Sequence, residues 1–301
     1  MKIFITGCEG QVGYELVQLL SAHHEVLAMN RSTLDLTQTA QVQQTLERFK
    51  PQLIINPAAY TAVDQAEDDV ELCEAVNTQV PMTLGEYATA QGIGLIHYST
   101  DYVYDGTKPE AYLETDTPNP RSVYGRTKLQ GDQALLEMNA PCCIFRTSWV
   151  YGPRGKNFFL TMKKLLVERD QLTVVNDQFG APTSARVIAA ATVSVIKQLE
   201  THANSLAYWQ SIKGVYHLTC HGRISWYDFA SAIAEKLKSD GHSVASLSPI
   251  SSQDYPCKAQ RPANSVLDCH KFESTFHDKL PLWEQAFDAV WQASQAKQSS
   301  S

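Results

Sequence analysis

The 301-residue sequence has little of what marks membrane, nucleic-acid-binding or metal-binding proteins. No apolar run approaches the ~20 residues that span a bilayer, and an early glycine interrupts the N-terminal segment before it could form a signal peptide. The net charge is -7 with no basic stripe to offset it, which argues against general nucleic-acid binding. Seven cysteines are present, without Cys-x-x-Cys or Cys/His metal-site spacing. We therefore expect a cytoplasmic protein that holds no metal and does not bind membranes.

Short apolar segments alternate with amphipathic helical patterns through the first half of the chain. The spacing predicts strands at residues 2–6, 25–29, 53–56, 94–99 and 142–147, and helices at residues 11–21, 38–49, 80–91 and 124–138. Strands that alternate with helices from the N-terminus predict an α/β fold with a doubly wound parallel sheet of the Rossmann type. Residues 1–150 would form this dinucleotide-binding domain.

After residue 150 the alternation becomes less regular. Residues 157–168, 184–199 and 225–238 look helical, residues 172–175 and 215–218 look like strands, and residues 243–261 show no clear periodicity. We interpret residues 151–301 mainly as a smaller α+β domain that caps the sheet and binds substrate. Some of its segments are expected to return to the sheet.

Three glycines lie between the first predicted strand and the first predicted helix, at Gly7, Gly10 and Gly13. A bound pyrophosphate needs backbone N–H groups at a helix N-terminus, and side chains there would block its approach. The spacing is looser than G-x-G-x-x-G, so glycines that serve only a tight turn are the alternative. Their place at the first strand–helix junction favours a dinucleotide site.

The end of the second predicted strand bears on the choice of cofactor. Sites for NAD usually place an acidic residue there to hold the ribose hydroxyls. Here Asn30, Arg31 and Ser32 stand at that point, and Arg31 could pair with the 2′-phosphate of NADPH. We therefore favour NADPH, with NADH possible. Asp35 and Leu36 could lie beside the adenine; the alternative for Arg31 is an exposed loop residue.

Tyr124 and Lys128 are four residues apart on a predicted helix, so their side chains project from one face. A nearby ammonium lowers the pKa of a phenol and brings it closer to an acid–base role. Such a pair also occurs by chance on ordinary surface helices. The glycine loop upstream, and the hydroxyls of Ser99 and Thr100 at the end of a predicted central strand, favour a catalytic role in a reductase.

Five stretches resemble the dTDP-4-dehydrorhamnose reductase family of the extended short-chain dehydrogenases/reductases. They run in order across about two thirds of the chain, and the stretch that begins at Arg261 extends the match. The stretches are Asn56-Pro-Ala-Ala-Tyr-Thr-Ala-Val-Asp64, Ser99-Thr-Asp-Tyr-Val-Tyr-Asp-Gly106, Val123-Tyr-Gly-Arg-Thr-Lys128, Arg146-Thr-Ser-Trp-Val-Tyr-Gly152 and Asp177-Gln-Phe-Gly-Ala-Pro-Thr183.

The resemblance implies a role for each matching residue. The implied catalytic set is Thr100, Tyr124 and Lys128. Further residues would touch the cofactor, namely Gln11, Val12, Ala58, Ala59 and Tyr60. Others would face the sugar nucleotide, namely Thr61, Val63, Thr100, Trp149 and Arg261. A core aromatic is the alternative for Trp149, and a surface salt bridge is the alternative for Arg261.

Some members of this family hold a divalent cation at a dimer interface. Glu15 matches one ligand, but the region expected to supply the others contains Arg186, which opposes cation binding. We therefore expect no metal, and leave open whether the chain is a monomer or a homodimer.

The implied reaction is reduction of the 4-keto group of dTDP-4-dehydro-L-rhamnose by NADPH, to give dTDP-L-rhamnose for cell-surface polysaccharides. An epimerase or dehydratase of the same fold is the nearest alternative; Asp101 follows Thr100, but no glutamate accompanies it. A regulatory subunit that binds NADP without turnover is the alternative outside enzymes.

Overall fold

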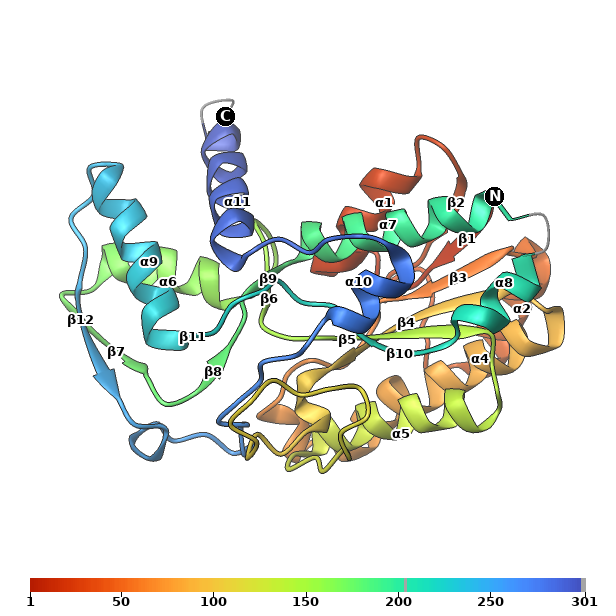
Figure 1. The fold of residues 1–301 in the computed structure, drawn as a ribbon, viewed down its shortest axis with the longest axis horizontal. Coiled ribbons are helices and arrows are strands. Elements are labelled where there is room, and N and C mark those ends of the chain that lie inside the picture. The colour runs from red at the N-terminus through yellow and green to blue at the C-terminus, as the bar shows by residue number, and fades with distance from the viewer. Residues whose placement is uncertain (203–204, 299–301) are drawn as a thin grey trace.

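The computed structural model describes residues 1–202 and 205–298, and a six-stranded parallel sheet forms its centre (Figure 1). The strand order is β10-β5-β4-β3-β1-β2. The strands are β1 (Lys2–Ile5), β2 (Glu25–Ala28), β3 (Leu53–Asn56), β4 (Gly94–Thr100), β5 (Cys142–Thr147) and β10 (Gly214–His217). The predicted doubly wound α/β fold is confirmed, and the predicted strands match β1 to β5 closely.

Helices cover both faces of this sheet, because side chains of successive strand residues point to opposite faces. Ile3 and Ile5 of β1 pack in one core cluster with Leu16 and Ile188, whereas Phe4 packs in another. Helices α1 (Gln11–Leu20) and α7 (Ala185–Glu200) supply the first cluster. Helices α2 (Thr39–Phe49), α4 (Val80–Gln91) and α5 (Val123–Glu137) supply the second.

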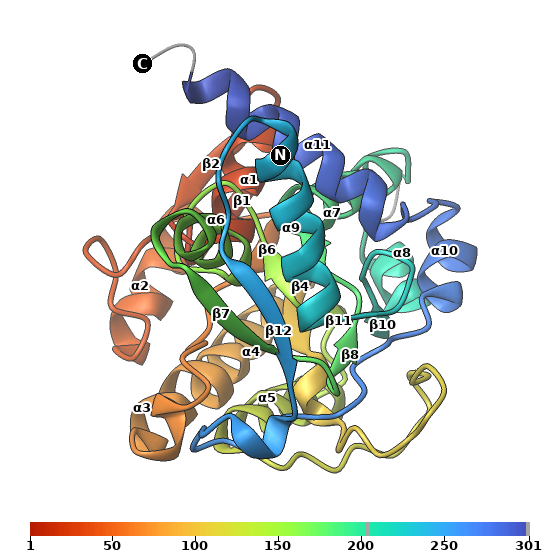
Figure 2. The same cartoon turned by 90° about the vertical axis from the view of Figure 1, so that its left-hand side faces the viewer.

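A smaller lobe stands beside the sheet, on the left of Figure 1 and facing the viewer in Figure 2. Its core gathers aromatic side chains such as Phe159, Phe229 and Trp291. Strand β12 pairs in parallel with β7, and Pro249 is tolerated there because both strands of a two-stranded sheet are edges. The elements are α6 (Phe158–Glu168), β7 (Gln171–Val175), α9 (Trp226–Ser239), β12 (Ser246–Ile250) and α11 (Trp283–Gln298).

The second half of the chain also contributes to the large sheet. Strand β10 pairs with β5 in register, with Val215 opposite Ile144. Trp209 and Phe272 join the same core cluster as α1 and α7. They belong to α8 (Ser205–Ile212) and α10 (His270–Phe276). The boundary of the two domains at residue 150 stays a prediction.

Short elements complete the connections. Helix α3 (Val70–Glu74) runs into a π-helical turn, η2 (Ala75–Gln79), and the 3₁₀ turn η3 (Asp101–Val103) follows β4 directly. The other 3₁₀ turns are η1 (Gln65–Glu67) and η4 (Ser252–Asp254), and the short strands are β6 (Val150–Tyr151), β8 (Phe179–Gly180), β9 (Thr183–Ser184) and β11 (Ile224–Ser225). None of the helices in the described part of the chain combines the length and apolar character needed to cross a bilayer.

Candidate active site

A cavity of about 750 Å³ opens at the carboxyl ends of the central strands. Ligands of open α/β sheets bind at this edge. The lining includes most of the residues predicted for the cofactor. They are Gly7, Gly10, Gln11, Val12, Gly13, Asn30, Arg31, Asp35, Leu36, Ala58, Ala59, Tyr124 and Lys128, together with Thr61 of the predicted substrate set.

The glycine loop brings the N-terminus of α1 to this cavity. Gly7 has a left-handed backbone, with φ of 54°, and a Cβ at Gly13 would lie 2.2 Å from the Gly7 carbonyl oxygen. Gly10 is the N-cap of α1 and offers no side chain to the helix. The first N–H groups of a helix have no carbonyl partner within it. These groups suit a bound pyrophosphate, so the loop fits a dinucleotide cofactor.

The end of β2 carries both charge signs beside the cavity. Arg31 is exposed and lines the cavity there. The Asn30 amide donates to Glu9 Oε1 at 2.8 Å, and its oxygen accepts from the backbone of Thr33 at 2.9 Å. Glu9, which was not predicted, thus places a carboxylate beside the strand end from the glycine loop. Arg31 can pair with a 2′-phosphate, whereas Glu9 can accept from ribose hydroxyls.

The apolar part of the lining includes several residues that sequence analysis missed. Leu72 lies on α3 and Val76 on η2, and 42% of Leu72 is exposed. They share the lining with Leu34 and Leu36. The sequence could not identify Leu72 as a lining residue, because an exposed leucine on a five-residue helix belongs to no periodic pattern. The remaining missed lining residues are Thr37, Pro57, Tyr98, Thr147, Val150, Gly155 and Lys156, whereas Ser99, named in the sequence analysis, is also in the lining.

Two local features place Tyr124 in the first turn of α5. The Ser122 side chain accepts a hydrogen bond from the Gly125 N–H at 3.1 Å and caps the helix. Gly125 lets the helix approach the segment after β4, because a Cβ there would lie 2.2 Å from the Tyr102 carbonyl oxygen. The rings of Tyr102 and Tyr124 meet edge to face, with centroids 5.5 Å apart. Tyr124 is therefore held beside the end of β4.

The protein groups around Tyr124 keep its phenol protonated. Burial raises its pKa, and a hydrogen bond with the Thr100 side chain opposes that rise. This differs from the expectation that Lys128 lowers the pKa, because desolvation outweighs the favourable interactions. The Thr100 hydroxyl itself donates to Asp101 Oδ1 at 3.0 Å. A protonated phenol beside a hydroxyl is an arrangement that can supply a proton to a carbonyl oxygen.

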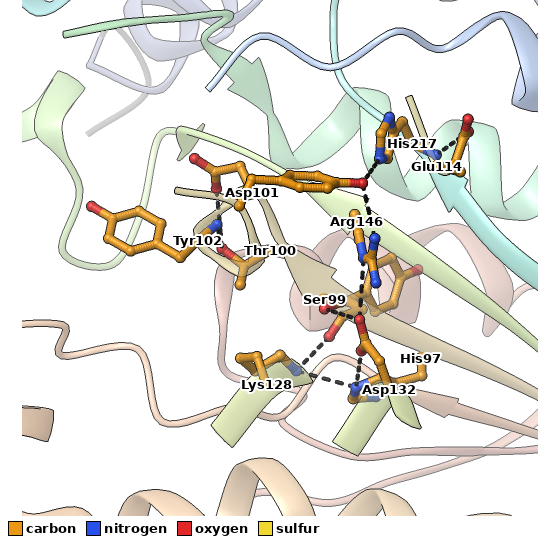
Figure 3. Close-up of polar contacts among 12 residues, drawn as sticks. His97, Ser99, Thr100, Asp101, Tyr102, Glu114, Lys128, Asp132, Arg146 and His217 are labelled. Carbon is orange, nitrogen blue, oxygen red and sulfur yellow. Dashed lines mark hydrogen bonds and ion pairs between the residues drawn. The ribbon is translucent and has the colours of Figure 1, made fainter. Parts of the chain in front are cut away.

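Lys128 lies one helical turn beyond Tyr124 and is almost completely buried. Its Nζ donates to the Tyr98 carbonyl oxygen at 2.6 Å and lies 3.2 Å from His97 Nε2 (Figure 3). Burial lowers the pKa of Lys128 to about 8, and the charge of Asp132 opposes that shift. The ammonium therefore sits near its titration point at physiological pH.

Five predicted residues lie outside the lining of this cavity, among them Thr100 at the end of β4. The buried Tyr60 donates through its hydroxyl to Asp69 at 2.7 Å, so that group is already engaged. Trp149 stacks on Trp226, with ring centroids 3.5 Å apart. The others are Val63 and Arg261. Of these five residues, Trp149 contacts the smaller lobe through Trp226 of α9.

Arg261 is held by an acidic side chain of the large domain. Its Nη2 lies 2.9 Å from Asp64 Oδ2, and the Ala259 N–H donates to Asp64 Oδ1 at 3.1 Å. Lys258 pairs with Asp68 next to it. A ligand anion at Arg261 would compete with Asp64.

Within residues 1–202 and 205–298, no group of three or more His, Cys, Asp or Glu side chains could hold a metal ion. Glu15 is half-buried on α1, and Arg186 is exposed on α7.

Comparison with known proteins decides the family. The family model described as RmlD substrate binding domain matches residues 1–296. The dTDP-4-dehydrorhamnose reductase of Burkholderia thailandensis is 41% identical over 290 residues, which cover 95% of this chain and 96% of that protein. The chain belongs to the dTDP-4-dehydrorhamnose reductase family. This confirms the resemblance and the prediction of an oxidoreductase.

Two solved structures of the family share the fold. A dTDP-4-dehydrorhamnose reductase from Clostridium acetobutylicum is 36% identical, with a TM-score of 0.88, and the match covers 98% of this chain and 100% of that chain. One from Bacillus anthracis, in complex with NADP, is 31% identical, with a TM-score of 0.88 and coverage of 97% and 99%. Both likenesses extend over the cavity and the smaller lobe.

Proposed function

We propose that the protein reduces the 4-keto group of dTDP-4-dehydro-L-rhamnose with NADPH and forms dTDP-L-rhamnose. The observation that carries this proposal is the group at the end of β4. A protonated Tyr124, the Thr100 hydroxyl and the buried Lys128 meet there, and Tyr124 and Lys128 line the cavity that begins at the glycine loop. The names of the relatives support the same reaction.

The three side chains then have different tasks. When bound, NADPH supplies a hydride for C4 of the sugar. Tyr124 gives its proton to the carbonyl oxygen, and Thr100 holds that oxygen against the phenol. Lys128 orients the nicotinamide ribose and stabilises the charge left on Tyr124.

Arg31 and Glu9 bear on the cofactor. A 2′-phosphate would pair with Arg31, which supports NADPH, and the relative from Bacillus anthracis was solved with NADP. Glu9 could accept from the ribose hydroxyls of NADH, so use of NADH is possible as well. The glycine loop with Gln11 and Val12 would bind the pyrophosphate. Asp35, Leu36, Ala58, Ala59 and Tyr60 remain the proposed contacts beyond it.

We place the sugar nucleotide between the two domains, against residues 151–301. Arg261 would hold the diphosphate, Trp149 would face the sugar or base, and Thr61 and Val63 would lie beside the reacting ring. The product would serve cell-surface polysaccharide synthesis from the cytoplasm.

Two other functions remain for the same fold. A dehydratase needs additional acid–base carboxylates beside Thr100; Asp101 is there, but no glutamate follows it. A regulatory subunit would bind NADP without turnover, and the intact set of Thr100, Tyr124 and Lys128 argues against that role.

The test is to follow NADPH absorbance with dTDP-4-dehydro-L-rhamnose generated in situ. We expect oxidation of one NADPH for each sugar and formation of dTDP-L-rhamnose by chromatography. UDP-galactose is the control for an epimerase and should give no product. Tight binding of NADPH without oxidation by any 4-keto sugar would contradict the proposal and favour the regulatory subunit.

A further inference from the structure

A cluster of buried polar side chains lies beside Lys128 (Figure 3). His97 of β4 and Asp132 of α5 are completely buried, and Arg146 of β5 is 3% exposed. The proposed reaction uses none of these three residues. Burying charged groups costs free energy unless each one finds a partner, so their arrangement calls for an explanation.

His97 stands between Lys128 and Asp132. Its Nε2 lies 3.2 Å from Lys128 Nζ and 3.9 Å from Asp132 Oδ1. On the other side of the ring, Nδ1 lies 3.1 Å from the amide nitrogen of Asn56. The Thr6 hydroxyl donates to the Asn56 amide oxygen at 2.6 Å, which fixes the orientation of the amide. The ring lies between these two donors, and a neutral imidazole can accept a hydrogen bond from only one of them.

The two oxygens of Asp132 have different surroundings. Oδ2 accepts from the Ser99 hydroxyl at 2.8 Å and from Arg146 Nε at 3.2 Å. Oδ1 has no hydrogen-bond partner in the part of the chain that the structure describes, and it faces His97. One carboxylate oxygen is thus engaged by Arg146, and the other points toward the side where Lys128 lies.

The charges near Lys128 make Asp132 its counter-charge. Burial, followed by the Lys128 charge, holds the pKa of His97 well below its usual value, so the ring is neutral. Burial raises the pKa of the Tyr124 phenol and of the Cys73 thiol of α3, so both of these neighbours are neutral too. Burial also raises the pKa of Asp132, but the cations Arg146 and Lys128 oppose this, and we assign it the charged form.

We propose that Asp132 and His97 are positioning residues for Lys128. The Asp132 carboxylate lets the buried lysine carry its proton, and the His97 ring fixes the separation of the two charges. This inference rests on the proposed function, in which a charged Lys128 stabilises Tyr124. Neither Asp132 nor His97 lines the cavity itself; they contact Ser99 and Lys128, which do.

Burial and the Asp132 charge shift the pKa of Lys128 in opposite directions, which decides how loss of Asp132 changes it. Burial lowers the pKa of Lys128 to about 8, and the Asp132 charge acts against this. Without that charge the pKa falls further, so the ammonium is lost at a lower pH. Activity that needs the ammonium should therefore decline at a lower pH as well.

The first experiment measures the pH dependence of kcat/KM for wild type, Asp132→Asn and Asp132→Glu. We expect wild-type activity to decline as pH rises through about 8. In Asp132→Asn the decline should begin about one pH unit lower or more, the usual effect of an opposite charge at this range. Asp132→Glu keeps the charge and should restore the wild-type profile.

The matched control is His217→Asn. His217 is also completely buried; its Nε2 lies 2.8 Å from the Tyr104 hydroxyl, and Tyr104 in turn accepts from Arg146 at 2.9 Å. Its loss weakens the same polar cluster but removes no contact of Lys128, so the profile should not move. A folded Asp132→Asn variant that binds NADPH normally and declines at the wild-type pH would overturn the proposal.

Asp132→Asn removes the ion-pair partner of the buried Arg146, and the variant can therefore fail to fold. A second measurement avoids this problem because it needs neither substrate nor an Asp132 variant. The ring nitrogens of His97 are followed by ¹⁵N NMR of the wild-type protein with labelled histidine, assigned through His97→Gln. We expect a step near the Lys128 titration at about pH 8, and its loss in Lys128→Met. His217, whose pKa burial lowers to about 3, should show no such step.

Absence of the His97 step in wild type, or its persistence in Lys128→Met, would overturn the inference. Failure of the proposed reaction would leave this titration unchanged, so the two failures can be told apart.

Discussion

Replacing Asp64 with asparagine should tighten substrate binding. Arg261, the proposed partner of the diphosphate, now pairs with Asp64 at 2.9 Å. The diphosphate must displace or share that contact. The free energy of substrate binding is therefore less favourable by the free energy of the ion pair. Removing the carboxylate and keeping the shape of the side chain would free Arg261 for the ligand.

The exposure of the pair limits the size of the gain. The side chains of Arg261 and Asp64 are 28% and 42% exposed, so solvent screens their attraction. Ion pairs of this kind contribute about 0.2–1 kcal/mol. Since 1.4 kcal/mol is a tenfold change, the KM for the sugar nucleotide should fall by roughly 1.4- to 5-fold, with kcat unchanged.

The assay is the initial rate of NADPH oxidation over a range of sugar nucleotide, with Asp68→Asn as the matched control. Asp68 pairs with Lys258 in the same segment, whereas the ion-pair partner of Arg261 is Asp64. Asp68→Asn should therefore leave the KM unchanged, and Arg261→Met should raise it about tenfold or more, by loss of a charge-assisted hydrogen bond. An unchanged KM in Asp64→Asn, or an equal drop in Asp68→Asn, would refute the reasoning.

Two further substitutions test the cofactor site. Gly13→Ala places a methyl group 2.2 Å from the Gly7 carbonyl oxygen, and such overpacking costs about 1–3 kcal/mol. The Kd for NADPH, measured by fluorescence titration, should therefore rise at least fivefold. Native affinity would contradict the fit of the loop to a pyrophosphate. Arg31→Ala should raise the KM for NADPH about tenfold and leave that for NADH nearly unchanged, through loss of a charge-assisted bond. Equal changes for both cofactors would count against a 2′-phosphate at Arg31.

The fold was predictable where local pattern and tertiary role agree. Buried parallel strands are short apolar runs, and the helices between them keep one apolar face, so β1 to β5 and their helices could be located from the sequence. Strand β12 could not, because a two-stranded edge with Pro249 has no apolar alternation. The place of β10 beside β5 also had no local signal, since strand order depends on contacts between distant segments.

The candidate site shows the same division. The glycine loop and the Tyr124–Lys128 pair follow from spacing along one loop and one helix. Glu9 was not predicted because its contact with Asn30 links the loops that follow two different strands. Desolvation of Tyr124 could not be read from the sequence either, because burial of a helix face depends on what packs against it.

The most direct test of the central claim compares wild type with Tyr124→Phe, which removes the phenolic oxygen and preserves the ring that contacts Tyr102. The rate of NADPH oxidation with dTDP-4-dehydro-L-rhamnose and the Kd for NADPH are measured on both proteins. If Tyr124 is the acid, kcat falls by about 10²–10⁴-fold while the Kd stays within a small factor of wild type. A Tyr124→Phe variant that turns over at the wild-type rate would show that another group protonates the sugar.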